Sequence, residues 1–196
     1  MKTIFNTALI TFILASLMIH FYPKQEVMVV PDKIHHAEIV KAVPKPKPVL
    51  TEQQQISKTA TAIVAIYRTL SVSQAKSVIK LVFNYSKQHK IDPYLVVGLI
   101  AAESGFRQNV VSDMGAGGFM QVMEVYHEDK VRGRNVFDPH VNIQVGVKIL
   151  ANCFKKYGSN QRALGCYNGT QSAKGIKAYS GKVLGKRDRI TRLAML

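Results

Sequence analysis

The sequence contains few acidic residues. It has 12 Asp and Glu against 27 Lys and Arg, which gives the 196-residue chain a formal net charge of +15. Residues 1–50 carry six Lys and three acids, or +3, and residues 51–196 carry 21 Lys and Arg and nine acids, or +12. The excess indicates an anionic partner. No helix-turn-helix, zinc-finger or aromatic-interleaved basic motif accompanies it, so we predict no binding to nucleic acid.

Patterns typical of metal and phosphate sites are absent as well. His35, His36, His127 and His140 are scattered without metal-ligand spacing, so we predict no metal site and no cofactor. The glycine-rich stretch 115–118 lacks the Lys-Ser/Thr ending of a phosphate-binding loop and does not follow a predicted strand. Its glycines are better suited to a close approach of the backbone to a ligand.

Cysteine is scarce, with Cys153 and Cys166 as the two cysteines of the chain. They fall on two predicted helices, 142–157 and 160–168, joined by a short turn. Adjacent antiparallel helices can bring two cysteines within bonding distance, and an oxidising compartment would permit a disulfide. Two buried free thiols are the alternative.

A long apolar run, residues 4–22, begins almost at the N-terminus. Its length is close to that needed to span a bilayer. A cleaved signal peptide is the alternative, but no small-x-small cleavage site follows the run. We therefore predict that residues 1–22 are a single-pass anchor in the inner membrane with the rest of the chain in the periplasm, or in a virion membrane if a phage encodes the protein.

Residues 23–50 are predicted to form an extended linker. The stretch Pro44-Lys45-Pro46-Lys47-Pro48 favours a polyproline conformation, which gains about 3 Å per residue and would hold a domain away from a membrane.

From residue 51 the hydrophobic pattern turns helical, and residues 51–196 are predicted to form one compact, mainly α domain. We expect Ser73 to cap the second helix. Residues 112–126 are the least regular and are expected to contain short extended pieces. The expected helices are 51–70, 73–89, 93–104, 142–157, 160–168 and 173–184.

Glu103 has an unusual predicted position. Asp92 and Pro93 are typical of a helix start, residues 94–102 are almost entirely apolar, and Gly105 predicts a stop. Such a helix is buried, so Glu103 lies in the last turn of a buried helix. Burial and the negative end of the helix dipole both raise the pKa of a carboxyl group, as a general acid requires. A surface glutamate is the alternative, although helix ends prefer Lys or Arg.

Several short blocks occur in a fixed order: Glu103-Ser104, Ser112, Gly115-Ala116-Gly117-Gly118-Phe119-Met120-Gln121, Asn142-Ile143-x-x-Gly146 and Tyr167-Asn168. Their residues and spacing resemble the catalytic domain of the soluble lytic transglycosylases, which is lysozyme-like (α+β). The resemblance covers about residues 75–185. Phe119 replaces the usual Leu, and Cys166 and Gly169-Thr170 replace Ala and Ala-Gly around the Tyr-Asn pair. Asp138-Pro139 also resembles the family's Asp-Pro before a helix, with Asp138 as a cap.

The resemblance implies that the chain cleaves peptidoglycan glycan strands between N-acetylmuramic acid and N-acetylglucosamine, with Glu103 as acid and then base and a 1,6-anhydro ring as the product. It also implies that Tyr167 hydrogen-bonds to Glu103 and orients it, that Ser112 and Gln121 bind sugar groups, and that Met123 and Asn168 line the cleft.

Two other functions are kept as alternatives. One is a muramidase that hydrolyses the same bond, and the other is a catalytically inactive wall-binding assembly protein. The small domain, which has no wall-binding repeat, favours local opening of the wall for a secretion, conjugation or phage apparatus.

Overall fold

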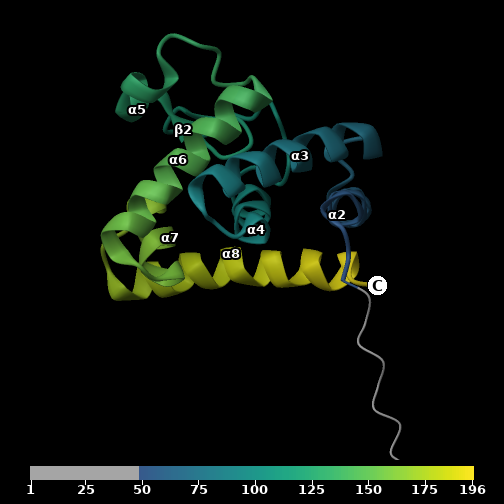
Figure 1. Cartoon of the computed structure of the whole chain (residues 1–196). Coiled ribbons are helices and arrows are strands. Elements are labelled where there is room, and N and C mark those ends of the chain that lie inside the picture. Colours follow the sequence, from purple (N-terminus) through teal and green to yellow (C-terminus); the bar gives the residue numbers. More distant parts are fainter. Residues whose placement is uncertain (1–48) are drawn as a thin grey trace, which may run out of the picture. The chain divides into compact units, whose positions relative to one another are not determined.

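The computed structural model describes residues 49–196 (Figure 1). The predicted anchor, residues 1–22, and nearly all of the predicted linker lie outside the described residues. Within residues 49–196, no helix combines the length and the apolar character needed to cross a membrane.

The described part of the chain is mainly helical, which confirms the mainly α prediction. Seven helices and one two-stranded antiparallel sheet form between residues 49 and 196. They are α2 (Glu52–Tyr67), α3 (Val72–His89), α4 (Pro93–Glu103), β1 (Ala116–Gly117), β2 (Val122–Met123), α5 (Glu124–Val131), α6 (Pro139–Tyr157), α7 (Asn160–Asn168) and α8 (Ala173–Ala194).

Two helix starts differ from the prediction because of their caps. Ser71, not Ser73, caps α3: the Ser71 hydroxyl accepts a hydrogen bond from the Gln74 backbone, and the Gln74 side chain accepts one from the Ser71 backbone. This reciprocal pair is a capping box. The predicted cap at Asp138 is confirmed, since its carboxylate accepts hydrogen bonds from the backbone N–H groups of His140 and Val141. Helix α6 therefore begins before the predicted residue 142.

Two helical segments were missed from the sequence. Helix α5 begins inside the stretch predicted to be irregular; its first turn has no side-chain cap, and its backbone kinks at His127, where φ is −137°. Helix α8 continues to Ala194, well past the predicted end at residue 184. Its last turns contain mostly polar residues, and packing of Ile190 and Ala194 into the core holds them in place.

Helix α4 is the centre of the fold, and its predicted burial is confirmed. Its side chains from Leu95 to Ala102 are all buried. Helix α8 runs alongside α4, with α7 near one end and α2 near the other (Figure 1). A Cβ atom on Gly98 would lie 2.7 Å from the Arg187 Cβ and 2.8 Å from the Val183 carbonyl oxygen. Glycine at this position therefore allows the two helix backbones to approach closely.

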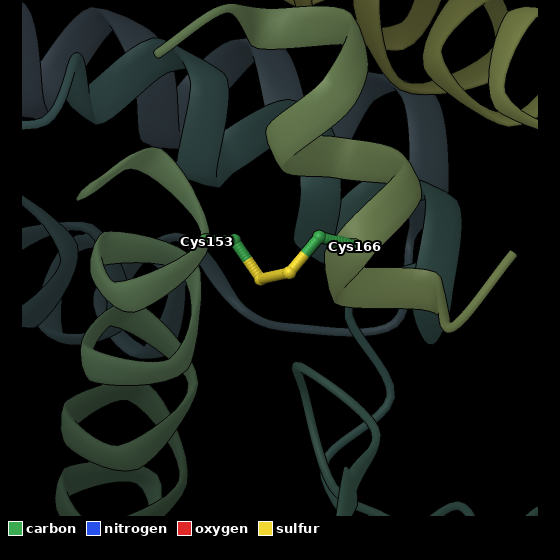
Figure 2. The surroundings of a disulfide bond; sticks show 2 residues. All are labelled: Cys153 and Cys166. Carbon is green, nitrogen blue, oxygen red and sulfur yellow. A yellow bond between two sulfur atoms is a disulfide. The ribbon is translucent and has the colours of Figure 1, made fainter. Parts of the chain in front are cut away.

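A disulfide joins α6 to α7. Cys153 and Cys166 face each other from neighbouring helices, with their Cα atoms 5.8 Å apart (Figure 2). The structure thus contains the disulfide and not the two free thiols. A disulfide that closes a loop of this length stabilises a fold by about 3 kcal/mol. This one attaches α7 to α6 at the residue directly before Tyr167.

Candidate active site

The predicted site residues meet in one cleft. Its volume is about 710 Å³, within the range typical of ligand-binding clefts. Glu103, the last residue of α4, lies in its wall. Of the predicted residues, the cleft brings together Glu103, Ser112, Gln121, Met123, Tyr167 and Asn168.

Glu103 is largely buried, and its electrostatic setting follows the sequence prediction. Burial raises the pKa of the Glu103 carboxyl above its ordinary value, while the hydrogen bond from Tyr179 and the positive charge of Lys182 lower it in part. The C-terminal end of α4 adds a negative potential that also opposes ionisation. Glu103 can therefore retain a proton at a higher pH than an exposed carboxyl group.

The tyrosine bonded to Glu103 is not the predicted one. The Tyr179 hydroxyl, from α8, donates a hydrogen bond to Glu103 Oε1. Tyr167, from α7, lies in the cleft but donates its hydroxyl hydrogen to the Met120 carbonyl oxygen at 2.7 Å. The predicted bond between Tyr167 and Glu103 is therefore wrong. Burial first, and then the charge of Glu103, raise the pKa of Tyr179, so its hydroxyl keeps the proton that it donates.

The sequence missed Tyr179 because no local pattern marks it. It lies on a basic helix, 76 positions from Glu103, and only the packing of α8 against α4 brings the two together.

Met120 is held from three directions. Its backbone N–H donates to Asn142 Oδ1 at 2.7 Å, and its carbonyl accepts the Tyr167 hydroxyl. A Cβ on Gly146 would lie 2.5 Å from the Met120 sulfur, so the absence of a side chain there makes room for the methionine. Residues from α6 and α7 thus fix the backbone immediately before Gln121.

The serine next to Glu103 also supports this loop. The buried Ser104 hydroxyl donates to the Phe119 carbonyl at 2.8 Å, which ties the end of α4 to the residue before Met120. Asn142, also buried, donates to the Gly117 and Val136 carbonyls, both at 2.8 Å. Buried polar side chains need such partners, and here each one stabilises the cleft wall.

Gln121 presents one free polar atom to the cleft. Its backbone lies in the left-handed region with φ of 48°, an uncommon conformation for a residue other than glycine. Its Nε2 donates to the Val110 carbonyl at 3.1 Å and the Gly118 carbonyl at 3.0 Å. Both amide hydrogens are therefore used, and Oε1 remains as an acceptor for a ligand.

Two further cleft residues, Tyr126 and His127, were not predicted. Tyr126 is 70% exposed and offers a flat aromatic face at the edge of the cleft. The His127 Nδ1 atom is buried and has no hydrogen-bond partner within residues 49–196. Burial, followed by the charge of Lys130, lowers the pKa of His127, so the ring is neutral at pH 7.

The buried Nδ1 atom favours the tautomer of His127 that carries its proton on Nε2, because buried N–H groups without a partner are rarer than acceptors without one. In the sequence, His127 lacks metal-ligand spacing, and its position shortly after Met120-Gln121 is the signal that could have identified it.

The sequence of the part that forms this cleft is similar to that of known proteins. The profile of the transglycosylase SLT domain matches residues 80–187, more than half of the chain. A transglycosylase of Enterobacteria phage PRD1 is 35% identical over 103 residues, which are 50% of this chain and 38% of the phage protein. The chain therefore matches well under half the length of that relative.

Solved structures give a weaker likeness. A complex of the 70-kDa soluble lytic transglycosylase with bulgecin A is 18% identical, with a TM-score of 0.46, over 76% of this chain and 28% of the other. The 70-kDa enzyme from Escherichia coli is also 18% identical, with a TM-score of 0.46, over 68% and 24% of the two chains. On the profile match across residues 80–187, the chain belongs to the transglycosylase SLT domain family.

Proposed function

We propose that this protein is a peptidoglycan lytic transglycosylase with a lysozyme-like catalytic domain. One observation carries the proposal: Glu103 is the one acidic residue among the described residues that line the cleft. It is largely buried at a helix end and bonded to Tyr179, so it has the surroundings of a general acid rather than of a surface carboxylate.

The reaction needs only this carboxyl group. Protonated Glu103 donates its proton to the oxygen that bridges N-acetylmuramic acid and N-acetylglucosamine, and the bond from that oxygen to the muramyl C1 breaks. The substrate's own acetamido oxygen stabilises the charge at C1. The 6-hydroxyl oxygen of the muramyl residue then bonds to C1, and the Glu103 carboxylate accepts the proton of that hydroxyl group. The products are a free N-acetylglucosamine end and a 1,6-anhydromuramic end, and Glu103 is protonated again.

The single carboxylate favours this route over the common hydrolytic ones. Most glycosidases use two carboxyl groups, the second of which activates water or forms a covalent intermediate. The described cleft wall offers no such second carboxylate. Tyr179 would act on Glu103 by orienting it and by stabilising its ionised form during the second step.

The remaining cleft residues would hold the sugar chain. Gln121 Oε1 is an acceptor suited to an N-acetyl N–H or a hydroxyl group. The Ser112 oxygen accepts the Ala116 N–H at 3.0 Å, which leaves its hydroxyl hydrogen for the ligand. His127 would donate from Nε2, and Met123 and Asn168 would complete the wall.

We further propose that the domain acts in the periplasm, or from a virion membrane, tethered through residues 4–22 and opening the wall for a secretion, conjugation or phage apparatus. The apolar N-terminal run and the proline-rich linker support this location. The disulfide suits an oxidising compartment, and the phage relative favours a phage context. Full-length protein in the membrane pellet after carbonate extraction would support the tether, whereas a shortened soluble form would indicate a cleaved signal peptide.

Mass spectrometry of digested sacculi tests the reaction. We expect muropeptides with 1,6-anhydromuramic ends, which weigh one water less than hydrolysis products. Reducing muramic ends as the main product would establish the muramidase instead. Sacculi that stay uncleaved in the presence of folded protein would leave only a wall-binding role.

A further inference from the structure

A second cavity, of about 530 Å³, lies beside the C-terminal end of α5, and most of the charged side chains that line it are basic. Tyr126 and His127 of α5 line the cleft, whereas the next turn of the same helix lines this second cavity. We call it the basic cavity and define it by His89 of α3, Asp129 and Lys130 of α5, Arg132 and Arg134 of the following loop, and Lys148 of α6.

The charges around the basic cavity do not cancel. Lys130, Arg132, Arg134 and Lys148 give four positive charges against one from Asp129, a net charge of +3 (4 − 1). Lys130 pairs with Asp129 at 2.9 Å, which leaves three cations without a carboxylate partner within residues 49–196. The hydrogen bond from Lys130 lowers the pKa of Asp129, and the charge of Lys148 adds to this effect, so one carboxylate is shared among several cations.

Hydrogen bonds within the chain hold Arg134 at three atoms and Arg132 at one. Arg134 donates from Nε to the Val131 carbonyl at 3.0 Å, from Nη1 to Gln144 Oε1 at 2.9 Å and from Nη2 to the Lys130 carbonyl at 2.9 Å. Each of its Nη atoms keeps one hydrogen for another acceptor. Arg132 donates from Nε to the Asp129 carbonyl at 3.1 Å, and both of its Nη atoms remain free. Both residues are exposed, but three hydrogen bonds make the Arg134 guanidinium an oriented donor, whereas Arg132 is anchored at one atom.

We propose that the basic cavity binds a phosphate ester. Oriented guanidinium groups match the oxygens of phosphate, and a net charge of +3 suits a multiply charged group better than a single carboxylate. The volume exceeds that of a bare anion, so the cavity has room for the organic part of the ester. The glycan bond proposed to be cut carries no phosphate, so this site is separate from the catalytic one and holds a different ligand.

Calorimetric titration of the full-length chain in mild neutral detergent with glycerol 3-phosphate tests the proposal. We expect saturable binding that weakens about ten-fold or more in the Arg132→Gln/Lys148→Gln variant, because two charge-assisted contacts are lost. The matched control is Lys174→Gln/Lys177→Gln, which removes the same charge from the exposed face of α8 and should bind within about two-fold of the parent. Lys148→Gln alone, at an exposed position, gives an intermediate loss and covers the case in which the double variant fails to fold.

Three results would overturn the proposal. The first is no binding of glycerol 3-phosphate by the parent chain, and the second is an equal loss in both double variants, which would mean a general effect of net charge. The third is equally tight binding of glutarate, which would point to carboxylates such as those of wall peptides. Cleavage of sacculi by all variants, measured in parallel, keeps a failure here distinct from a failure of the proposed enzyme activity.

The same variants identify the source of the phosphate. If phospholipid headgroups are the ligand, the parent and control chains should sediment more completely with phosphatidylglycerol vesicles than the Arg132→Gln/Lys148→Gln variant, with no difference on phosphatidylcholine vesicles. The N-terminal apolar run is common to all three chains and cancels in the comparison. If the variants sediment alike while glycerol 3-phosphate still distinguishes them, the ligand is a soluble phosphate ester.

Discussion

Helices α7 and α8 each place one tyrosine near Glu103, and the two hydroxyl groups have different partners. Tyr167 of α7 donates to the Met120 carbonyl and so supports the wall of the cleft. Tyr179 of α8 donates to the carboxyl group itself. Both rings are largely buried, so burial alone does not separate a supporting residue from one that acts on the acid. The hydrogen-bond partner of each hydroxyl group distinguishes the two roles, and four substitutions test that distinction.

Glu103→Gln should have the largest effect, since it removes the acid itself. We expect the rate of sacculus digestion to fall about 10²–10⁴-fold, the usual contribution of a general acid-base group. Turbidity loss of purified sacculi measures the rate, and circular dichroism checks the fold. Residual activity near that of the parent would remove Glu103 from the acid role.

The same variant carries a stability prediction. Because the folded-state pKa of Glu103 is raised, ionisation costs the folded state free energy, and the parent loses stability as pH rises from the unfolded-state pKa towards the folded-state pKa. Glutamine does not ionise, so Glu103→Gln should be more stable than the parent at neutral pH, with the difference shrinking in acid. Melting temperatures across pH would show this trend, and a constant difference would contradict it.

Tyr179→Phe should come second, with a rate about ten- to a hundred-fold lower. The hydrogen bond from Tyr179 lowers the Glu103 pKa, so its loss should raise that pKa and move the alkaline limb of the pH–rate profile to higher pH. Initial rates over a pH series measure both effects. An unchanged rate with an unmoved limb would indicate that Tyr179 only fills space.

Tyr167→Phe should lower stability more than it lowers the rate. It leaves the Met120 carbonyl without its partner, a loss of about 1–3 kcal/mol for a buried acceptor. We expect a lower melting temperature, a rate within about ten-fold of the parent and no shift of the alkaline limb. A rate loss as large as that of Tyr179→Phe would erase the distinction between the two tyrosines.

Lys182→Met should have the smallest effect on the rate. It tests whether a charge on α8 acts on Glu103 without a hydrogen bond. The exposed Lys182 lowers the Glu103 pKa through its charge alone, so its removal should move the alkaline limb upward while the maximal rate stays close to that of the parent. Added salt should shrink the difference between the two proteins, because screening weakens the contribution of an exposed charge. A shift that persists in high salt would point to a structural change instead.

The sequence by itself determined the environment of Glu103. Asp92 and Pro93 set the start of α4, and the apolar residues that follow leave the helix no face for solvent, so the acid at its end is largely shielded from water. The short blocks around Ser112, Gln121 and Tyr167 also identified residues that line the cleft, through their resemblance to the pattern of a known family.

Only the tertiary structure decided which groups touch the acid. Tyr179 lies on a helix whose local pattern is basic and polar, and a hydrogen bond over 76 positions depends on how α8 packs against α4 at Gly98. The roles of Tyr167 and Asn142 were hidden for the same reason, because their partners are backbone atoms of a loop that carries no periodic pattern. Local preferences fix helices and their ends, whereas contacts between distant elements depend on the packing of the whole core.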